Sequence, residues 1–411
     1  MKTFLQWLLP LFLFALPSGA VDTSTLDGKL MCGYQGWFNA EGDGAQRGWA
    51  HWTKAKGTPS AANIKIDLWP DVSELAPDER FATALRFPDG RVAELFSSYK
   101  RDTVLRHFRW MRDYGIDGAF IQRFIGSLRD PRFRQHNDTV LAHCRDGAKI
   151  SGRGYAVMYD LSGLGAGRIG EVIDDWHRLR DEMKITGDAA YQRHRGKPLV
   201  AVWGVGFNDR RAYTLAECRQ LVEALKRDGC TVMLGVPAHW RTLAHDAVND
   251  PALHEILALA DIVSPWTVGR YHDEAAARRY AERTVAADIA WCREHRLDYL
   301  PVAFPGFSWH NMKGDTLDAI PRKHGAFFWS QVVADKNAGA TMLYVAMFDE
   351  VDEGTAIFKC VAQPPTSNGA RFVGFDGGPD FYLRLAGLAG KVLRGELPPT
   401  NSVPLVAEKK P

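Results

Sequence analysis

Short, continuous apolar runs alternate along the chain with longer amphipathic stretches. The apolar runs predict strands, and they span residues 30–38, 118–124, 154–161, 198–207, 230–240, 260–270, 299–309 and 340–348. Each run is followed, at once or after a loop, by a stretch with helical periodicity. These predicted helices span residues 102–114, 134–149, 169–183, 215–227, 253–259, 274–294, 322–338 and 381–392. Because the runs are continuous, we expect strands buried on both faces, as in a parallel sheet covered by helices.

Eight strand–helix alternations predict an α/β fold, a (β/α)8 TIM barrel, in preference to an open doubly wound sheet. A chain of 411 residues with 46% hydrophobic content can fill such a core. No short repeat or low-complexity linker divides it, so we expect a single domain over residues 21–395. The Pro-rich, charged segment 396–411 is expected to be a flexible tail. The irregular segment 39–98 is a long first βα loop, and such loops usually shape the cleft of a barrel.

The first twenty residues have the pattern of a signal peptide. Lys2 precedes an apolar stretch over residues 4–16, and the small residues Ser18 and Ala20 form an A-x-A-like cleavage site. The apolar stretch is too short to span a membrane comfortably. We therefore expect cleavage after Ala20, a secreted or periplasmic protein, and no membrane insertion after cleavage.

Charge and cysteine content narrow the possible partners. The formal net charge of +2 gives no reason to expect a nucleic acid or an anionic membrane, and we expect a monomer. Six cysteines occur without C-x-x-C or His pairing, which argues against a metal cluster. Export would permit disulfides, but the sequence does not choose between pairings, and most cysteines are interpreted as buried apolar residues.

The last predicted strand ends in a cluster of acidic residues. In the segment ATMLYVAMFDEVDEGT, residues 340–355, an apolar run stops at Asp349, Glu350, Asp352 and Glu353. The C-terminal ends of strands are where barrel enzymes carry their chemistry. Carboxylates this close shift one another's pKa values apart, as general acid–base catalysis requires. The simpler interpretation is an acidic loop that faces water.

The other predicted strand ends are also polar and aromatic. Rings that stack on sugar faces, beside side chains that pair with hydroxyls, predict a polyol-binding cleft. The residues predicted to contact the ligand, with two from the long loop, are Tyr34, Gln35, His51, Trp52, Gln122, Arg123, Asp160, Trp203, His239, Trp240, Trp266, Trp309 and His310. The same strand ends also carry Trp37, Tyr159, Asn208, Arg270 and Asn311.

Each of these residues also has a structural interpretation. The tryptophans could cap the core, Asp160 could cap a helix or turn, and Arg123 could pair with a nearby acid. The acidic cluster could instead hold Ca²⁺ or Mg²⁺, although it lacks the spacing of an EF-hand loop. No G-x-S-x-G motif suggests a serine nucleophile, and GLGAG at residues 163–167 is interpreted as a loop. We expect neither a metal nor a cofactor.

The motifs GYQGWF, RGWAHW and DEVDEGT resemble the glycoside hydrolase family 99/71-like superfamily of retaining, endo-acting α-glycosidases. The segments IDLWPDVSEL and YGIDGAFIQRF look like a bacterial branch often labelled xylosidase/arabinosidase. The resemblance covers nearly the whole mature chain. It implies an exported retaining glycoside hydrolase that cleaves α-linked polysaccharide or glycan. The alternatives are a catalytically inactive carbohydrate-binding barrel and a metal-dependent hydrolase.

The resemblance also implies roles for two glutamates. The family pattern Asn-Glu-Trp-x-Glu-Gly-Thr maps onto residues 349–355, so Glu350 would assist attack by the substrate's own 2-hydroxyl and Glu353 would serve as acid and base. Residues three apart on a helical turn lie about 5–6 Å apart at Cβ, near the roughly 5–5.5 Å carboxyl separation of retaining enzymes. Asp349 replaces the family's Asn, and Val351 with Asp352 replaces Trp-His. We therefore do not carry over mannose specificity, and we expect Asp349 and Asp352 to alter substrate preference.

Overall fold

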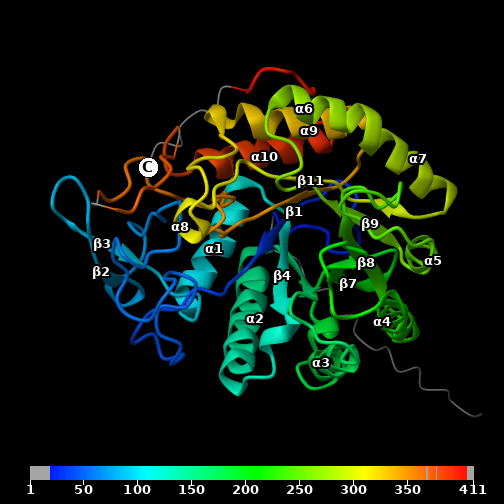
Figure 1. Ribbon diagram of the computed structural model, residues 1–411, viewed down its shortest axis with the longest axis horizontal. Coiled ribbons are helices and arrows are strands. Elements are labelled where there is room, and N and C mark those ends of the chain that lie inside the picture. The colour runs from blue at the N-terminus through cyan, green and yellow to red at the C-terminus, as the bar shows by residue number, and fades with distance from the viewer. Residues whose placement is uncertain (1–18, 367–368, 376, 405–411) are drawn as a thin grey trace, which may run out of the picture.

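The structure, a computed structural model, describes residues 19–366, 369–375 and 377–404 (Figure 1). All of the predicted signal peptide except Gly19 and Ala20 lies outside the described residues. The last part of the predicted tail, residues 405–411, lies outside them as well. The first part, residues 396–404, makes contacts with the folded chain. Trp329 Nε1 donates a hydrogen bond to the carbonyl of Thr400 (2.8 Å), and Leu397 and Val403 pack against the core.

A curved, mostly parallel sheet forms the centre of the molecule. Its strands are β1 (Leu30–Tyr34), β4 (Gly118–Phe124), β5 (Gly154–Asp160), β6 (Arg193–His194), β7 (Lys197–Trp203), β8 (Thr231–Pro237), β9 (Ile262–Trp266), β10 (Asp298–Tyr299), β11 (Val302–Ala303) and β12 (Leu343–Val345). They follow the order β10-β9-β8-β7-β5-β4-β1-β12-β11, and β6 adds to β7 in the antiparallel direction. Every position of β1, β5 and β8 is buried, as the continuous apolar runs predict.

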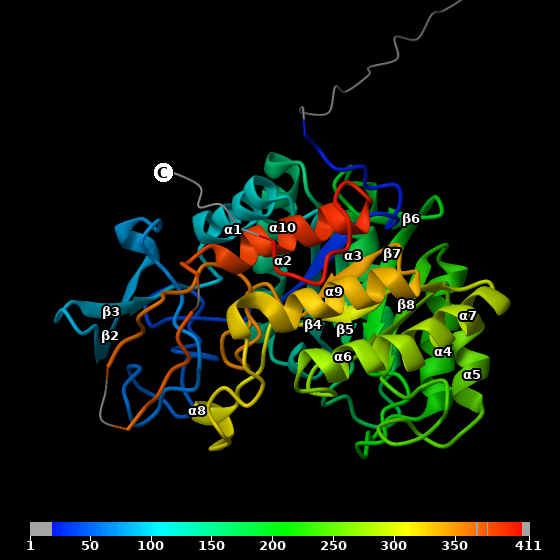
Figure 2. The same cartoon turned by 90° about the horizontal axis from the view of Figure 1, so that it is seen from above.

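Helices surround the outer face of this sheet (Figures 1 and 2). They are α1 (Arg101–Tyr114), α2 (Pro131–Ser151), α3 (Gly170–Asp181), α4 (Leu215–Arg227), α5 (Ala252–Leu257), α6 (Glu274–Tyr280), α7 (Ala286–Glu294), α9 (Ala326–Ala338) and α10 (Phe381–Leu393). The short helix α8 (His310–Lys313) lies apart from them, in the loop that follows β11 (Figure 2). A π-helical turn, Ala281–Val285, joins α6 to α7. Local signals set the ends of several helices. Asp130 caps α2 by accepting from Arg132 N, and Thr214 with Glu217 forms a capping box on α4.

The predicted α/β alternation is confirmed, and the arrangement is TIM-like. Most strands are shorter than the apolar runs suggested. For example, β1 ends at Tyr34, β9 ends at Trp266, and the run at 299–309 forms only the short strands β10 and β11. Pro301 lies between those two strands and has no N–H to donate to a ladder. Accordingly, β10 pairs only with β9, whereas β11 pairs only with β12.

The long loop between β1 and α1 has structure of its own. Its antiparallel hairpin joins β2 (Phe81–Arg86) to β3 (Val92–Leu95) through the FPDGR turn, and Figure 2 shows this hairpin lying to one side of the main sheet. Elsewhere the loop packs tightly, since Trp52, Ile66 and Trp69 are almost completely buried. The loop is therefore part of the core on this side of the sheet.

Two further predictions concern the cysteines and the membrane. All six cysteines fall in the described part of the chain, and each is buried with a free thiol, as expected for small apolar residues. Among the described residues, no helix is both long and apolar enough to cross a membrane.

Candidate active site

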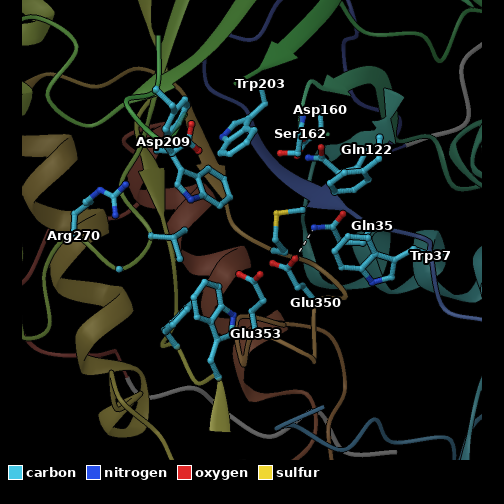
Figure 3. Close-up of a pocket in the computed structure, with 18 of the residues that line it drawn as sticks. Gln35, Trp37, Gln122, Asp160, Ser162, Trp203, Asp209, Arg270, Glu350 and Glu353 are labelled. Atoms are coloured by element: carbon cyan, nitrogen blue, oxygen red, sulfur yellow. Dashed lines mark hydrogen bonds between the residues drawn. The ribbon is translucent and has the colours of Figure 1, made fainter. Parts of the chain in front are cut away.

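The carboxyl ends of the parallel strands surround a cavity of about 490 Å³. Its walls come from β1, β4, β5, β7, β9, β11 and β12 and from the loops that follow them. The lining residues are Gln35, Trp37, Gln122, Phe124, Asp160, Ser162, Trp203, Phe207, Asp209, Arg211, Trp266, Val268, Gly269, Arg270, Phe307, Trp309, Met347, Glu350 and Glu353. In Figure 3, Glu350 and Glu353 lie on one side and Asp160 and Trp203 face them from the other.

The two glutamates lie on a tight turn that follows β12. Thr355 N donates to the carbonyl of Glu350 (3.2 Å) and closes the turn, while Ser308 N donates to the carbonyl of Glu353 (2.9 Å). Gly354 adopts a φ of +67°, and a Cβ at that position would meet Ser308 N at 3.0 Å. The turn therefore requires glycine both for its backbone conformation and for its close approach to the loop after β11.

Asp349 precedes the turn and clamps it to the end of β1. Its Oδ1 accepts a hydrogen bond from Gln35 N (2.7 Å), and its Oδ2 accepts one from Gly36 N (2.9 Å). Burial raises the pKa of Asp349 to about 7, although these two hydrogen bonds oppose the rise. Asp349 does not line the cavity. Both of its oxygens are directed at backbone N–H groups of residues 35 and 36, so Asp349 holds the turn against the end of β1.

Glu350 is buried at the base of the cavity and receives two hydrogen bonds. Gln35 Nε2 donates to Oε1 (2.6 Å), and Thr355 Oγ1 lies 3.0 Å from Oε2. Burial, and then the negative charges of Glu353 and Asp352, raise the pKa of Glu350 well above its ordinary value. The two hydrogen bonds act in the opposite direction and favour the ionised form.

Glu353 faces the same cavity with weaker hydrogen-bonding support. Burial, followed by the charge of Asp352, raises its pKa to about 7. The indole of Trp309 opposes this rise, but its Nε1 lies outside hydrogen-bond geometry. Two coupled acids lose their protons as a pair. Burial raises the pKa of Glu350 as well, so the hydrogen bonds decide where the charge lies. Glu350 accepts from Gln35 and Thr355, whereas Trp309 makes no hydrogen bond of good geometry to Glu353, so the geometry favours the charge on Glu350 and the remaining proton on Glu353.

Asp352 contacts the long loop and does not line the cavity. Its Oδ2 lies 2.9 Å from Lys65 Nζ and 3.6 Å from His51 Nδ1. Burial favours the neutral acid, but Lys65 and His51 outweigh it and hold the pKa of Asp352 below its usual value. The four acidic side chains thus point to different partners. Within the described residues, no group of three His, Cys, Asp or Glu side chains is placed to hold a metal ion.

Six of the predicted ligand contacts do meet in this cavity. They are Gln35, Gln122, Asp160, Trp203, Trp266 and Trp309. Gln122 Nε2 donates to Tyr344 Oη (3.1 Å). Asp160 accepts from Ser162 N (2.6 Å), and burial raises its pKa to about 6. Trp203 and Trp266 meet edge to face, with ring centres 5.6 Å apart. Gln122, Asp160 and Trp203 lie across the cavity from the glutamates (Figure 3), whereas Gln35 contacts Glu350 and Trp309 lies beside Glu353.

Three predicted aromatic contacts belong to the core and are corrected. Tyr34 is fully buried, and its Oη lies 2.9 Å from His107 Nδ1. Trp52 is buried and donates from Nε1 to the carbonyl of Phe96 (3.1 Å). Trp240 is buried against Trp291. Each ring fills space behind the strand ends, so none can stack on a ligand in the cavity.

Arg123 is also corrected, because its side chain points to the helices outside the sheet. Arg123 alternates with Gln122 along β4, so the two side chains lie on opposite faces. Its guanidinium donates to both oxygens of Asp175 (2.5 and 2.7 Å) and to Asp138 (2.8 Å). Arg178 also contacts both of these acids. Arg123 therefore joins β4 to α2 and α3 in a buried ion-pair network.

None of the three predicted histidines lines the cavity. The ring of His51 stacks on Trp37, with centres 3.9 Å apart and planes within 8°. His239 Nδ1 lies 2.9 Å from Asp246 Oδ1. His310 Nδ1 contacts the carbonyl of Asp315 (2.8 Å). The three histidines thus contact other parts of the protein, and His51 supports the cavity wall from behind Trp37.

In the loop that follows β7, the sequence singled out Asn208 but neither Asp209 nor Arg211, which line the cavity. Arg211 from this loop donates to Asp209 Oδ1 (2.7 Å) and to Ser162 Oγ (3.1 Å), and its guanidinium lies 5.0 Å from the Trp203 ring centre. The loop shows no strand or helix periodicity, so the sequence gives no sign of which residues face inward. Trp37 and Arg270, by contrast, lie at strand ends that were already recognised as polar and aromatic.

The fold resembles that of solved glycoside hydrolases. A GH99 endo-alpha-mannosidase structure from Bacteroides thetaiotaomicron is 14% identical, with a TM-score of 0.67 over 90% of this chain and 99% of that one. A second GH99 endo-alpha-mannosidase structure, in complex with BIS-TRIS-propane, gives a TM-score of 0.64 at 14% identity over 90% and 99% of the two chains.

A structure described as a glycoside hydrolase-like protein is also similar, with 14% identity and a TM-score of 0.51 over 82% of this chain and 98% of that one. No protein-family model matches the sequence, and no curated protein matches it significantly. At this level of identity, the likeness establishes a shared fold. The fold implied by the family 99/71 resemblance is therefore confirmed.

Proposed function

We propose that the protein is a retaining glycoside hydrolase that cleaves α-linked polysaccharide or glycan. The observation that carries this proposal is that Glu350 and Glu353 line one cavity, both with raised pKa values, beneath a wall of tryptophan rings. A carboxylic acid that keeps its proton near neutral pH, beside a carboxylate that can lose it, is the pair that glycoside hydrolysis uses.

The hydrogen bonds in the cavity agree with the roles implied by the family resemblance. Ionised Glu350, held by Gln35 and Thr355, would take the proton of the substrate's 2-hydroxyl as that oxygen attacks the anomeric carbon. Glu353 would give its proton to the departing glycosidic oxygen. It would then take a proton from the water that completes hydrolysis, while Glu350 returns its proton to the 2-oxygen. Each residue ends the cycle in its starting state.

A glycan panel tests the proposal directly. Wild type is expected to release products from at least one α-linked glycan, whereas Glu350→Gln and Glu353→Gln should bind that glycan and cleave it far more slowly. Chromatography measures the products, and calorimetry with the same glycan measures binding. Full activity in both variants would rule out these roles. Binding by wild type without any product would instead favour the inactive carbohydrate-binding barrel.

The raised pKa values predict an unusual pH dependence. In the active form one of the two glutamates is protonated and the other is ionised. The value of kcat/KM should therefore fall at low pH, where both are protonated, and at high pH, where neither is. Because both pKa values are raised, with that of Glu353 at about 7, both limbs should lie above the range of ordinary carboxylates. A pH profile of kcat/KM measures this. An acid limb near the usual glutamate pKa would contradict it.

Two further proposals concern location and sheet closure. We propose that the protein is exported, on the strength of the signal-peptide pattern in residues 1–20. We also propose that the sheet closes as an eight-stranded barrel through the segment between β10 and β11. Leu300 N donates to the carbonyl of Val263 (2.9 Å), and Tyr344 N donates to the carbonyl of Pro301 (3.0 Å), which supports such a connection.

A further inference from the structure

Asp352 occupies an unusual position between the two proposed catalytic residues. It lies on the same turn, is fully buried, and does not line the cavity. Within the described residues, neither of its carboxylate oxygens accepts a hydrogen bond of good geometry. A buried charge without such bonds is costly unless a cation compensates it. Lys65 Nζ, at 2.9 Å, provides that compensation.

The cation comes from the long loop, which also holds the turn through its backbone. Asp67 N and Leu68 N both donate to the carbonyl of Val351 (3.0 and 3.2 Å), directly beside Asp352. His51, from the same loop, lies 3.6 Å from Asp352 Oδ2. Its ring stacks on Trp37, which lines the cavity. One ion-pair cluster therefore connects the loop, the turn and the cavity wall.

We propose that Asp352 is a positioning residue for the Glu350–Glu353 pair, a fixed buried anion that the long loop holds in place and that keeps one proton on the pair. This inference rests on the proposed function for its catalytic meaning. Asp352 acts through the glutamates and does not itself touch substrate.

The charges around Asp352 support this role. They come from Lys65 and Arg47 on the long loop, from Glu350, Glu353 and Asp349 on the turn and its approach, and from Asp160 at the end of β5, which acts on Glu353. His51 also contacts Asp352, but burial lowers the pKa of its ring and favours the neutral form. The anion of Asp352 is the second-largest cause of the raised pKa of Glu353, after burial. It is the third-largest cause for Glu350, after burial and the charge of Glu353. Lys65 lowers the pKa of Glu353. The anion and its partner cation thus act on the pair in opposite directions.

Opposite shifts of the pH profile test the inference. Asp352→Asn should move both the acid limb and the alkaline limb of the pH profile of kcat/KM to lower pH by about one unit. One unit is the low end of the pKa shift that a nearby charge causes. Lys65→Met should move the high-pH limb upward. The double variant Lys65→Met/Asp352→Asn removes both charges, so neither is left buried without its partner. The limbs of its pH profile should therefore fall between those of the two single variants. Lower kcat in all three variants with unmoved limbs would show a merely structural role and overturn the inference.

A readout without substrate separates this inference from the proposed function. Carboxyl ¹³C NMR of glutamate-labelled protein follows the titration of Glu350 and Glu353, assigned with the two Gln variants. The raised titration should move to lower pH in Asp352→Asn even if no glycan is ever cleaved. Unchanged titration curves would overturn the inference although hydrolysis is observed, while shifted curves without hydrolysis would overturn only the proposed function.

Discussion

Replacing Glu353 by glutamine is expected to lower kcat on an unactivated glycan by roughly 10²- to 10⁴-fold, the usual contribution of a positioned general acid. The amide keeps the shape of the side chain but cannot give a proton to the glycosidic oxygen. A glycosyl fluoride needs no such proton, since fluoride leaves as an anion. The first step should therefore be largely restored for the fluoride of the same sugar. Steady-state and burst kinetics on the two substrates measure the difference.

Glu350→Gln is the matched control for this experiment. It removes the group that would take the proton from the 2-hydroxyl, and the attack by that oxygen is needed whichever leaving group departs. Its activity should therefore remain low on both the glycan and the fluoride. If the two variants showed the same dependence on leaving group, the assignment of Glu353 as the acid and Glu350 as the base would be incorrect.

Arg123→Met is expected to lower the free energy of unfolding by about 3 kcal/mol, the lower end of the range for breaking a buried ion pair. The arginine side chain is 3% exposed and Asp175 is 7% exposed, so neither charge is screened by water. The low end applies because Arg178 remains beside Asp175 and Asp138 after the change. Denaturant unfolding monitored by circular dichroism gives the value.

Arg270→Met provides the contrasting arginine. Arg270 lines the cavity, with its side chain 33% exposed and its Nε donating to Asp246 (2.7 Å). Its loss should change the free energy of unfolding by no more than about 1 kcal/mol and should raise KM. A stable Arg123→Met protein with a raised KM would restore the original prediction that Arg123 contacts the sugar.

Sequence periodicity was sufficient for the fold because burial on both faces leaves a continuous apolar run wherever a strand lies. It was less informative about direction. Along β4, Gln122 faces the cavity while Arg123 faces the helices, and both are polar residues at the end of one strand. Because successive side chains of a strand point to opposite faces, only one of the two can face the cavity, but the sequence does not say which.

The acidic turn was the most reliable feature of the site, since Glu350 and Glu353 both reach the cavity. The neighbouring acids could not be distinguished from them by type or spacing. Asp349 and Asp352 have their partners in the segment 35–65, hundreds of residues earlier in the chain, and only the folded structure reveals those contacts. The same limitation applies to Arg211, whose loop has no periodicity.

The hydrogen bond from Gln35 N at the end of β1 to Asp349 joins residues 314 positions apart. Another, from His310 N to Asp67 Oδ2 (2.6 Å), joins residues 243 positions apart. Contacts of such long range form only after large entropic costs of loop closure have been met. The backbone groups at the end of β1 can bind Asp349 only after β12 and the acidic turn that follows it have been synthesised. The cavity is therefore among the last parts of the protein to assemble, and an unfinished chain contains most of its walls but neither of its glutamates.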